Sequence, residues 1–283
     1  MNTPIDKLAV ARSFTRAADH YDEHDFVQRE TGARLLERFK LFSLEPSALI
    51  DLGSGTGRFT RTIKKRYPKA QSIQLDIALG MLLNARRSDR RWFPKYRFVC
   101  ADFEALPFAD ASVDLVFSNL AFQWCADLTA TFKEVRRVLR KDGLIVFSTL
   151  GPQTLHELRD AWLRGTGSEP IMRFVDMHDV GDALVHAGFA NPVIESETLD
   201  VRYATVKDLL RDLKGIGANA APVNAGLGGK GRFREFMTAY ETYRQAGRLP
   251  ATYELIFAHA WAGRTPAAQP QEATFPISAL GRR

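Results

Sequence analysis

Two hydrophobic periodicities divide the chain into strand-like and helix-like segments. Between residues 48 and 149, short runs of apolar and β-branched residues alternate with longer segments whose apolar positions recur at helical spacing. The short runs predict strands at 48–52, 72–75, 97–100, 113–118 and 144–149. The segments between them predict helices near 58–66, 78–88 and 127–139. Regular alternation of strands and helices is typical of βαβ units on a parallel sheet, so we expect an α/β fold.

The regions on either side of this block carry mainly helical patterns. Before residue 46, apolar residues recur at helical spacing, beginning with Val10, Phe14, Ala17 and Tyr21. After residue 150 the pattern predicts helices near 154–163, 178–187, 205–214 and 232–246, and strands at 193–201 and 253–261. Residues 264–283 contain three prolines and little periodicity, which is typical of a loosely held tail.

Composition limits the class of protein. Of the 283 residues, 45% are hydrophobic and 25% are charged, which excludes collagen-like, wholly disordered and coiled-coil chains. No apolar run approaches the roughly 18 residues of a transmembrane helix, and the N-terminal stretch has no signal-peptide core. Two cysteines cannot form a disulfide framework, and we expect a cytoplasmic protein. The formal net charge of +6 permits an acidic partner without identifying one.

The strongest local signal is a glycine-rich turn after the first predicted strand. The strand leads into Asp51, and glycines follow at alternate positions, Gly53, Gly55 and Gly57, with Ser54 between the first two. Glycine lets the chain turn tightly and lets a ligand approach bare backbone. A strand-to-helix turn without a ligand has the same pattern, so the motif alone leaves both interpretations open.

Polar residues follow three further strands of the predicted sheet. Asp76 ends the second strand, Asp102 follows the third and Asn119 follows the fourth. In a doubly wound sheet the carboxyl ends of the strands line the ligand crevice, and an acid after the second strand accepts ribose hydroxyls. Each residue alone is more often a cap or turn residue. Their register with the glycine turn favours a nucleotide site.

The glycine turn departs from two common nucleotide-binding motifs. Its glycines do not follow the Gly-x-Gly-x-x-Gly spacing, and no Walker Gly-Lys-Ser/Thr is present.

The pattern of the glycine turn and the strand-end residues resembles the class I S-adenosylmethionine-dependent methyltransferases, over about residues 48–150. This resemblance implies S-adenosylmethionine as cofactor and a Rossmann-like, seven-stranded, mostly parallel sheet with helices on both faces. The cofactor-binding residues that it implies are Asp51, Gly53, Ser54, Gly55 and Gly57 for the methionine moiety, Asp76 for the ribose, Met81, Asp102 and Phe103 for the adenine, and Asn119 near the methionine end.

Further motifs, within this block and on either side of it, narrow the resemblance. They include NLAFQWC at 119–125, STL at 148–150, TLHELRDAW at 154–162, RF at 173–174, LKGIGA at 213–218, LPATYE at 249–254 and HAW at 259–261. With SFTRAADHYD at 13–22 and QR at 28–29, they resemble the malonyl-carrier-protein O-methyltransferases of biotin synthesis, over about residues 7–262. That family methylates the free carboxylate of malonyl-acyl-carrier protein. The resemblance implies that Tyr21 and Gln28 cover the cofactor and that Gln123 and Trp124 contact the substrate.

The same resemblance divides the chain into functional parts. It implies an N-terminal helical lid, a methyltransferase core, a helical insert or cap, a last core strand and a flexible tail, at 1–46, 47–204, 205–250, 251–263 and 264–283 respectively. The insert precedes the last strand of the sheet.

The implied reaction needs an anion-binding residue rather than a base. A carboxylate with a reference pKa of about 4 is ionised at pH 7 and is already a nucleophile. This agrees with the lack of an obvious catalytic histidine or acid directly after Asn119. Arg173 is our candidate for holding the malonyl carboxylate, because a guanidinium binds a carboxylate through two hydrogen bonds. A plain surface arginine is the alternative interpretation.

Two basic stretches offer docking faces for an acidic carrier protein. We favour the stretch with Arg211 and Lys214, in the insert, over the stretch with Arg86 and Arg87. We expect no nucleic-acid or membrane partner. The alternative functions are another small-molecule carboxyl or quinone-precursor methyltransferase, and a respiratory-complex assembly factor with protein-arginine hydroxylase activity.

A metal site is the remaining candidate. His20 and His24 lie four positions apart, but no third ligand has suitable spacing. Methyl transfer to a carboxylate needs no metal, so we expect none.

Overall fold

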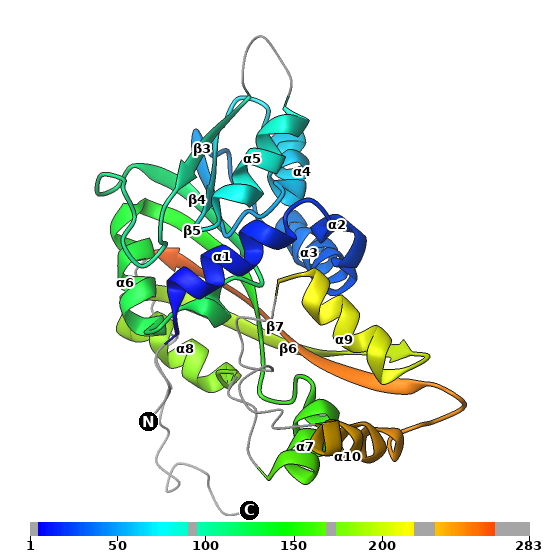
Figure 1. The fold of residues 1–283 in the computed structure, drawn as a ribbon. Coiled ribbons are helices and arrows are strands. Elements are labelled where there is room, and N and C mark those ends of the chain that lie inside the picture. The colour runs from blue at the N-terminus through cyan, green and yellow to red at the C-terminus, as the bar shows by residue number, and fades with distance from the viewer. Residues whose placement is uncertain (1–4, 90–94, 168–173, 218–229, 264–283) are drawn as a thin grey trace, which may run out of the picture.

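A single mixed sheet organises the chain (Figure 1). The computed structural model describes residues 5–89, 95–167, 174–217 and 230–263. Within these residues seven strands pair in the order β3-β2-β1-β4-β5-β7-β6. Their bounds are β1 Ala48–Leu52, β2 Gln71–Asp76, β3 Tyr96–Cys100, β4 Val113–Asn119, β5 Leu139–Leu150, β6 Phe189–Tyr203 and β7 Leu249–Ala262. β7 is antiparallel to both neighbours, and the other pairs are parallel. The predicted seven-stranded, mostly parallel sheet is confirmed.

Helices cover both faces of the sheet, and alternate strand residues supply two separate cores. Leu49 of β1 packs in one cluster with Leu35 of α3 (Phe26–Arg38) and Ile63 of α4 (Arg58–Arg66). Its neighbour Ile50 packs in the other cluster with Phe132 of α6 (Leu128–Val138) and Leu184 of α8 (Met177–His186). Successive side chains of a strand point to opposite faces, which explains why neighbouring residues of β1 such as Leu49 and Ile50 are both apolar. Helix α5 (Leu79–Ser88) packs against β2 and β3.

The last three strands run further than the hydrophobic pattern predicted. β5 begins at Leu139 rather than near 144, and β6 and β7 extend several residues beyond 193–201 and 253–261. β7 pairs with β6 along its whole length, ending where Tyr203 lies opposite Leu249. In β5 and β6, backbone pairing therefore carries the strands through exposed residues such as Lys141, Asp142 and Asn191, where hydrophobicity gives no signal.

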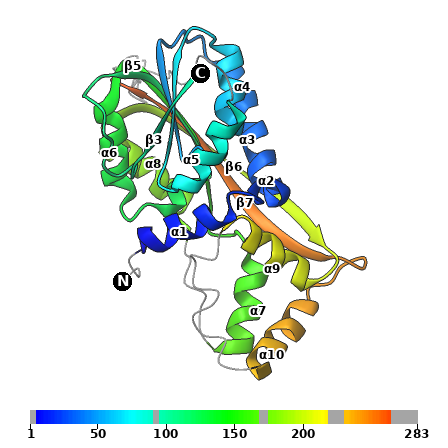
Figure 2. The same cartoon turned by 45° about the horizontal axis from the view of Figure 1, so that its top comes forward.

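Three helices surround the long end of β6 and β7. α7 (His156–Thr166) and α10 (Lys230–Glu241) lie side by side beyond the sheet, and α9 (Val206–Gly215) lies along β6 (Figures 1 and 2). The rings of Trp162 and Phe236 stand 5.3 Å apart between α7 and α10. A Cβ atom at Gly165 would lie 2.5 Å from the backbone nitrogen of Phe236, so the two helices approach closely there. α7 thus joins the helices of the insert in space.

The N-terminal region folds as α1 (Lys7–Ala17), α2 (Tyr21–His24), α3 and a short 3₁₀ helix, η1 (Phe39–Leu41). α1 crosses the molecule near the carboxyl ends of the strands (Figure 1). Its Ser13 hydroxyl donates to the carbonyl of Gly217, just after α9, and its Thr15 hydroxyl accepts from the backbone of Gly80 in α5. Of the helices in the described ranges, none is long and apolar enough to cross a membrane.

Candidate cofactor and substrate site

The glycine turn links β1 to α4 in a conformation that requires glycine. Gly53, Gly55 and Gly57 have φ angles of +67°, +54° and +76°, in the left-handed region that side chains disfavour. A Cβ atom at Gly53 would lie 2.5 Å from the Cβ of Ala121, whereas one at Gly55 would meet nothing within 4 Å. The backbone nitrogen of Gly53 donates to the carbonyl of Leu75. The turn is therefore fixed against β2 while Gly55 leaves open space beside the backbone.

Two buried carboxylates lie at this turn. Asp76 accepts hydrogen bonds from the backbone nitrogens of Gly55 (2.9 Å) and Ala78 (2.8 Å). Asp51 accepts one from the hydroxyl of Thr60. Burial raises the pKa of Asp76 to about 6. Burial, with a smaller contribution from Asp76, raises the pKa of Asp51 to about 7. Their ionised forms lack solvation, so this end of the crevice favours a ligand that is a cation or a hydroxyl donor.

Met81 of α5 packs against the N-terminal helices. It is 1% exposed and packs with Ala18, and with the partly buried side chains of Phe14 and Tyr21. The ring of Phe14 also stands edge-on to Trp124, 5.4 Å between centroids. α1 therefore spans from the predicted adenine side of the crevice to the predicted substrate side.

Asp102 and Phe103 follow β3, but their side chains point to different partners. Asp102 pairs with Lys7 of α1 at 2.5 Å and accepts from the backbone nitrogen of Glu104 at 2.9 Å. Phe103 is 8% exposed and packs against the ring of Phe122 at 5.7 Å. The structure thus uses Asp102 to hold α1, a contact between residues 95 positions apart.

Asn119 ties three parts of the crevice together. Its Nδ2 donates to the carbonyl of Gln28 at 3.0 Å, and its Oδ1 accepts from the hydroxyl of Ser148 at 2.8 Å. Next to it, Gln123 donates to the carbonyl of Leu120 at 2.7 Å. Both side chains are therefore held in place by hydrogen bonds to neighbouring elements.

Polar atoms near the turn are buried without partners. Among the described residues, Gln28 Oε1 and Ser54 Oγ are buried and make no hydrogen bond. Burial raises the pKa of the Tyr21 hydroxyl, and the nearby charges of Asp25 and Asp76 raise it further. Buried polar atoms normally have partners, so unpaired ones at a crevice indicate where a polar ligand binds.

Sequence patterns did not reveal a set of contacts between α2–α3 and the glycine turn. The Thr56 hydroxyl donates to Asp22 Oδ1 at 2.8 Å, and Arg58 Nη2 pairs with Asp25 Oδ2 at 2.9 Å. These pairs are more than 30 positions apart in the chain. No local motif carries such a signal.

The remaining predicted residues are outside the crevice or outside the described part of the chain. Arg173, the candidate for the malonyl carboxylate, falls outside the described residues. Arg211 and Lys214 are exposed on α9, where Arg211 pairs with Asp208 at 2.9 Å. His24 contacts Asp212 of α9 at 2.9 Å. Over the described ranges, no group of three or more histidine, cysteine or acidic side chains is arranged to hold a metal ion.

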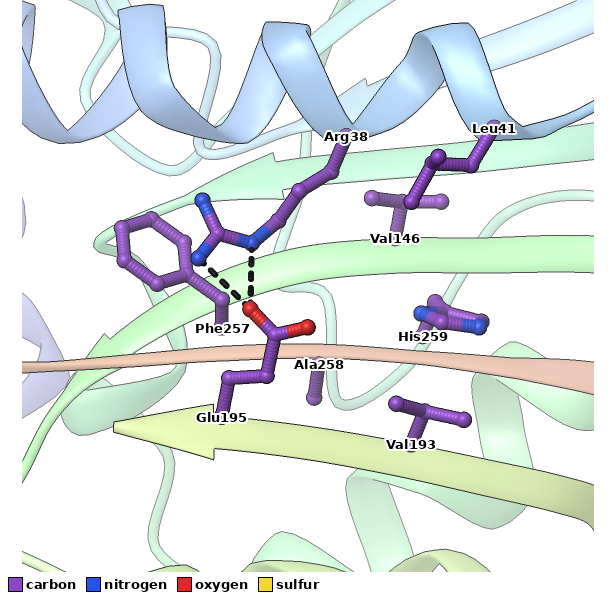
Figure 3. A pocket seen from close by; sticks show the side chains of 8 residues that line it. All are labelled: Arg38, Leu41, Val146, Val193, Glu195, Phe257, Ala258 and His259. Carbon is purple, nitrogen blue, oxygen red and sulfur yellow. Dashed lines mark hydrogen bonds and ion pairs between the residues drawn. The ribbon is translucent and has the colours of Figure 1, made fainter. Parts of the chain in front are cut away.

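A pocket under η1 lies away from the glycine turn. It is bounded by Arg38, Leu41, Glu195 and His259 with neighbouring strand residues (Figure 3). Arg38 donates to Glu195 at 3.0 and 2.7 Å and lies 3.9 Å from the centroid of the Phe257 ring. The charges of Arg38 and Glu195 therefore compensate each other within the pocket. Burial lowers the pKa of His259, another residue of its lining. This pocket contains none of the predicted site residues.

Comparisons with known proteins agree on the class. A methyltransferase-domain family matches residues 50–147. The YcgJ protein of Bacillus subtilis has a similar structure, with a TM-score of 0.60 at 16% identity, covering 84% of this chain and all of that one. The malonyl-[acyl-carrier protein] O-methyltransferase of Methylovorus sp. is 48% identical over 94% of this chain and 92% of its own. The protein of the same name from Gallionella capsiferriformans is 48% identical over 91% of both chains.

The sheet order, the glycine turn and these matches define a class I S-adenosylmethionine-dependent methyltransferase. Within that class, the chain belongs to the malonyl-[acyl-carrier protein] O-methyltransferase family. The residues present fit S-adenosylmethionine as methyl donor. The buried carboxylates of Asp51 and Asp76 suit a cationic nucleoside, and the unpaired atoms of Gln28 and Ser54 offer it hydrogen bonds.

Proposed function

We propose that this protein transfers a methyl group from S-adenosylmethionine to the free carboxylate of malonyl-acyl-carrier protein. The product is the malonyl methyl ester that starts pimeloyl and biotin synthesis. The observation that carries this proposal is the 48% identity to malonyl-[acyl-carrier protein] O-methyltransferases over more than nine-tenths of both chains. The relatives therefore match the lid and insert regions as well as the cofactor-binding block.

S-adenosylmethionine, when bound, would supply an electrophilic methyl carbon to the carboxylate oxygen, with its sulfur as the leaving group. The attacking group is an anion at neutral pH, so no protein side chain needs to remove a proton. Opposite charges neutralise each other as the bond forms, which a dry site favours. Phe14 over Trp124 contributes to excluding water at the substrate side, and Asn119 holds the end of β4 against α3 and β5.

We assign the cofactor contacts as follows. Asp51 and the glycine turn, with Ser54, hold the methionine moiety, and Asp76 accepts the ribose hydroxyls. Met81, Asp102 and Phe103 border the adenine. Asn119 lies near the methionine end, and Tyr21 and Gln28 close over the cofactor from the N-terminal helices. Support for these roles comes from the unpaired buried atoms and the open space at Gly55.

We assign the substrate contacts to Arg173, Gln123 and Trp124. Arg173→Ala should leave cofactor binding intact and sharply lower turnover, and Arg173→Lys should recover only part of it, because an ammonium lacks the planar fork. Wild-type turnover in both variants would mean that another residue holds the carboxylate. The acidic carrier protein docks on the face with Arg211 and Lys214, and the reaction takes place in the cytoplasm without nucleic acid.

The direct test is to incubate the protein with methyl-labelled S-adenosylmethionine and malonyl-carrier protein. Label on the carrier as a methyl ester, released by mild base, is the expected result. Acetyl-carrier protein is the matched control, because it lacks the free carboxylate. Label on the control, or on neither carrier, would refute the proposed substrate.

A further inference from the structure

Two acidic residues of the N-terminal helices contact the glycine turn directly. Asp22 of α2 accepts a hydrogen bond from the Thr56 hydroxyl at 2.8 Å, and its Oδ1 lies 3.5 Å from Arg58 Nη2. Asp25, between α2 and α3, pairs with the same Nη2 at 2.9 Å. Thr56 and Arg58 flank Gly57, the last glycine of the turn. One guanidinium therefore serves two carboxylates at the point where the turn enters α4.

The pairing is largely screened from solvent. The Asp25 side chain is 4% exposed and that of Arg58 is 33% exposed. Arg58 Nε and Asp25 Oδ1 are both buried, and neither makes a hydrogen bond within the described residues. Arg29 is the other cation near Asp25, at 3.6 Å, but it is half-exposed. Arg58 is thus the principal partner of a carboxylate that water cannot solvate, and removing it would leave that charge poorly compensated.

These contacts bracket the proposed lid residues. The segment 21–28 begins with Tyr21 and ends with Gln28, whose Oε1 is unpaired. The rest of α3, after Gln28, is anchored independently of the Arg58–Asp25 pair. Leu35 is fully buried, and a Cβ atom at Gly32 would lie 2.0 Å from the ring of Phe59. The anchoring of α3 therefore does not depend on Arg58. Segment 21–28 is held by His24 and Gln28 at other points, and Asp22 and Asp25 are its contacts with the turn.

We propose that Arg58 is a positioning residue for cofactor binding, which holds segment 21–28 over the glycine turn by pairing with Asp22 and Asp25. The pairing couples the two parts of the cofactor site, so the turn and the segment reach their binding positions together. This inference rests on the proposed use of the turn by S-adenosylmethionine, but not on the identity of the methyl acceptor.

Cofactor binding without the carrier protein tests the inference. Titration calorimetry with S-adenosylmethionine should show affinity weakened between about 5- and 150-fold in Arg58→Ala, the usual range for coupled sites. Arg58→Lys should recover part of the loss. The exchanged pair Arg58→Asp with Asp25→Arg should bind more tightly than either single variant. Amides in 21–28 should exchange with deuterium faster in ligand-bound Arg58→Ala than in the ligand-bound wild type.

The matched control is Arg38→Ala. Arg38 also joins α3 to carboxylates, Glu195 and Glu197 of β6, but it lies in the pocket of Figure 3, away from the turn. It should lower the melting temperature and leave cofactor affinity unchanged. Equal loss of affinity in Arg38→Ala would overturn the inference, and so would unchanged affinity in Arg58→Ala. If cofactor binding follows these expectations while malonyl-carrier protein is not methylated, the proposed substrate fails and the role of Arg58 stands.

Discussion

The buried carboxylate of Asp51 should make the stability of the ligand-free protein fall as the pH rises. Burial raises its pKa from 3.8 to about 7 in the folded state. Between about pH 4 and 7 the folded protein therefore binds more protons than the unfolded chain, and the free energy of unfolding decreases through this window. The favourable contribution is fully present below the unfolded pKa and is lost as the pH passes the folded pKa.

The magnitude follows from the size of the shift. At 1.36 kcal/mol per pKa unit, the rise in the Asp51 pKa corresponds to about 4 kcal/mol in the free energy of unfolding. This stability is lost mainly between pH 4 and 7. Asp51→Asn removes this titration. Burial also raises the pKa of Asp76, to about 6, and that of Asp25, and it lowers that of His259. These three residues titrate in both the wild type and the variant. Their contributions cancel in the difference between the two proteins.

Urea unfolding at pH 5, 6, 7 and 8, at constant ionic strength, measures that difference. Relative to wild type, Asp51→Asn should gain about 3 kcal/mol of stability over the series, nearly all of it between pH 5 and 7. A difference that stays constant across the four pH values would refute the reasoning, because it would mean that Asp51 is ionised in the folded protein throughout. A saturating cationic cofactor should reduce the wild-type slope, since it stabilises the ionised carboxylate.

Three further predictions concern the site and its cover. Asp76→Ala should weaken S-adenosylmethionine binding by about 1–3 kcal/mol in titration calorimetry, because a charged acceptor is lost and the Gly55 amide is left unpaired; unchanged affinity would displace the ribose from Asp76. Gly32→Ala should lower stability by about 1–3 kcal/mol in thermal unfolding, since the added methyl overlaps the Phe59 ring; Phe59→Leu should relieve this, and failure to do so would point to a different cause. Deleting residues 1–30 should leave a folded protein with weaker cofactor binding and almost no turnover, and full activity would show that the helices are not a lid.

The first four strands were predictable because each is a short run rich in apolar residues, and β1, β2 and β4 are buried along most of their length. β1 matches the predicted 48–52, and β2, β3 and β4 match within two residues. Their patterns are local, so the sequence alone identifies them. β6 shows why the others were harder. It is an edge strand whose residues alternate between partly buried and exposed, and pairing with β7 rather than hydrophobicity sets its ends.

The candidate site was predictable to the extent that strand ends define it. Asp51, Asp76 and Asn119 were recognised because they come at the ends of apolar runs in a βαβ pattern. In the structure they lie at the carboxyl ends of the adjacent strands β1, β2 and β4. What could not be predicted was their partners. Asp102 pairs with Lys7, and Asn119 with the backbone of Gln28, across 95 and 91 positions. Such contacts depend on how the N-terminal helices dock, which no local spacing encodes.

The position of these contacts fits a methyltransferase whose proposed acceptor, an ionised carboxylate, needs no general base. Two strand-end residues assigned to the cofactor also hold a part of the N-terminal region: Asp102 holds α1 and Asn119 holds α3. The glycine turn holds α2 through Thr56. α1 and α2 are held in turn by the insert, through Gly217 and Asp212. An ionised carboxylate needs alignment and a dry environment rather than proton removal. The residues that control turnover should therefore lie at these junctions, where the sheet, the N-terminal helices and the insert meet.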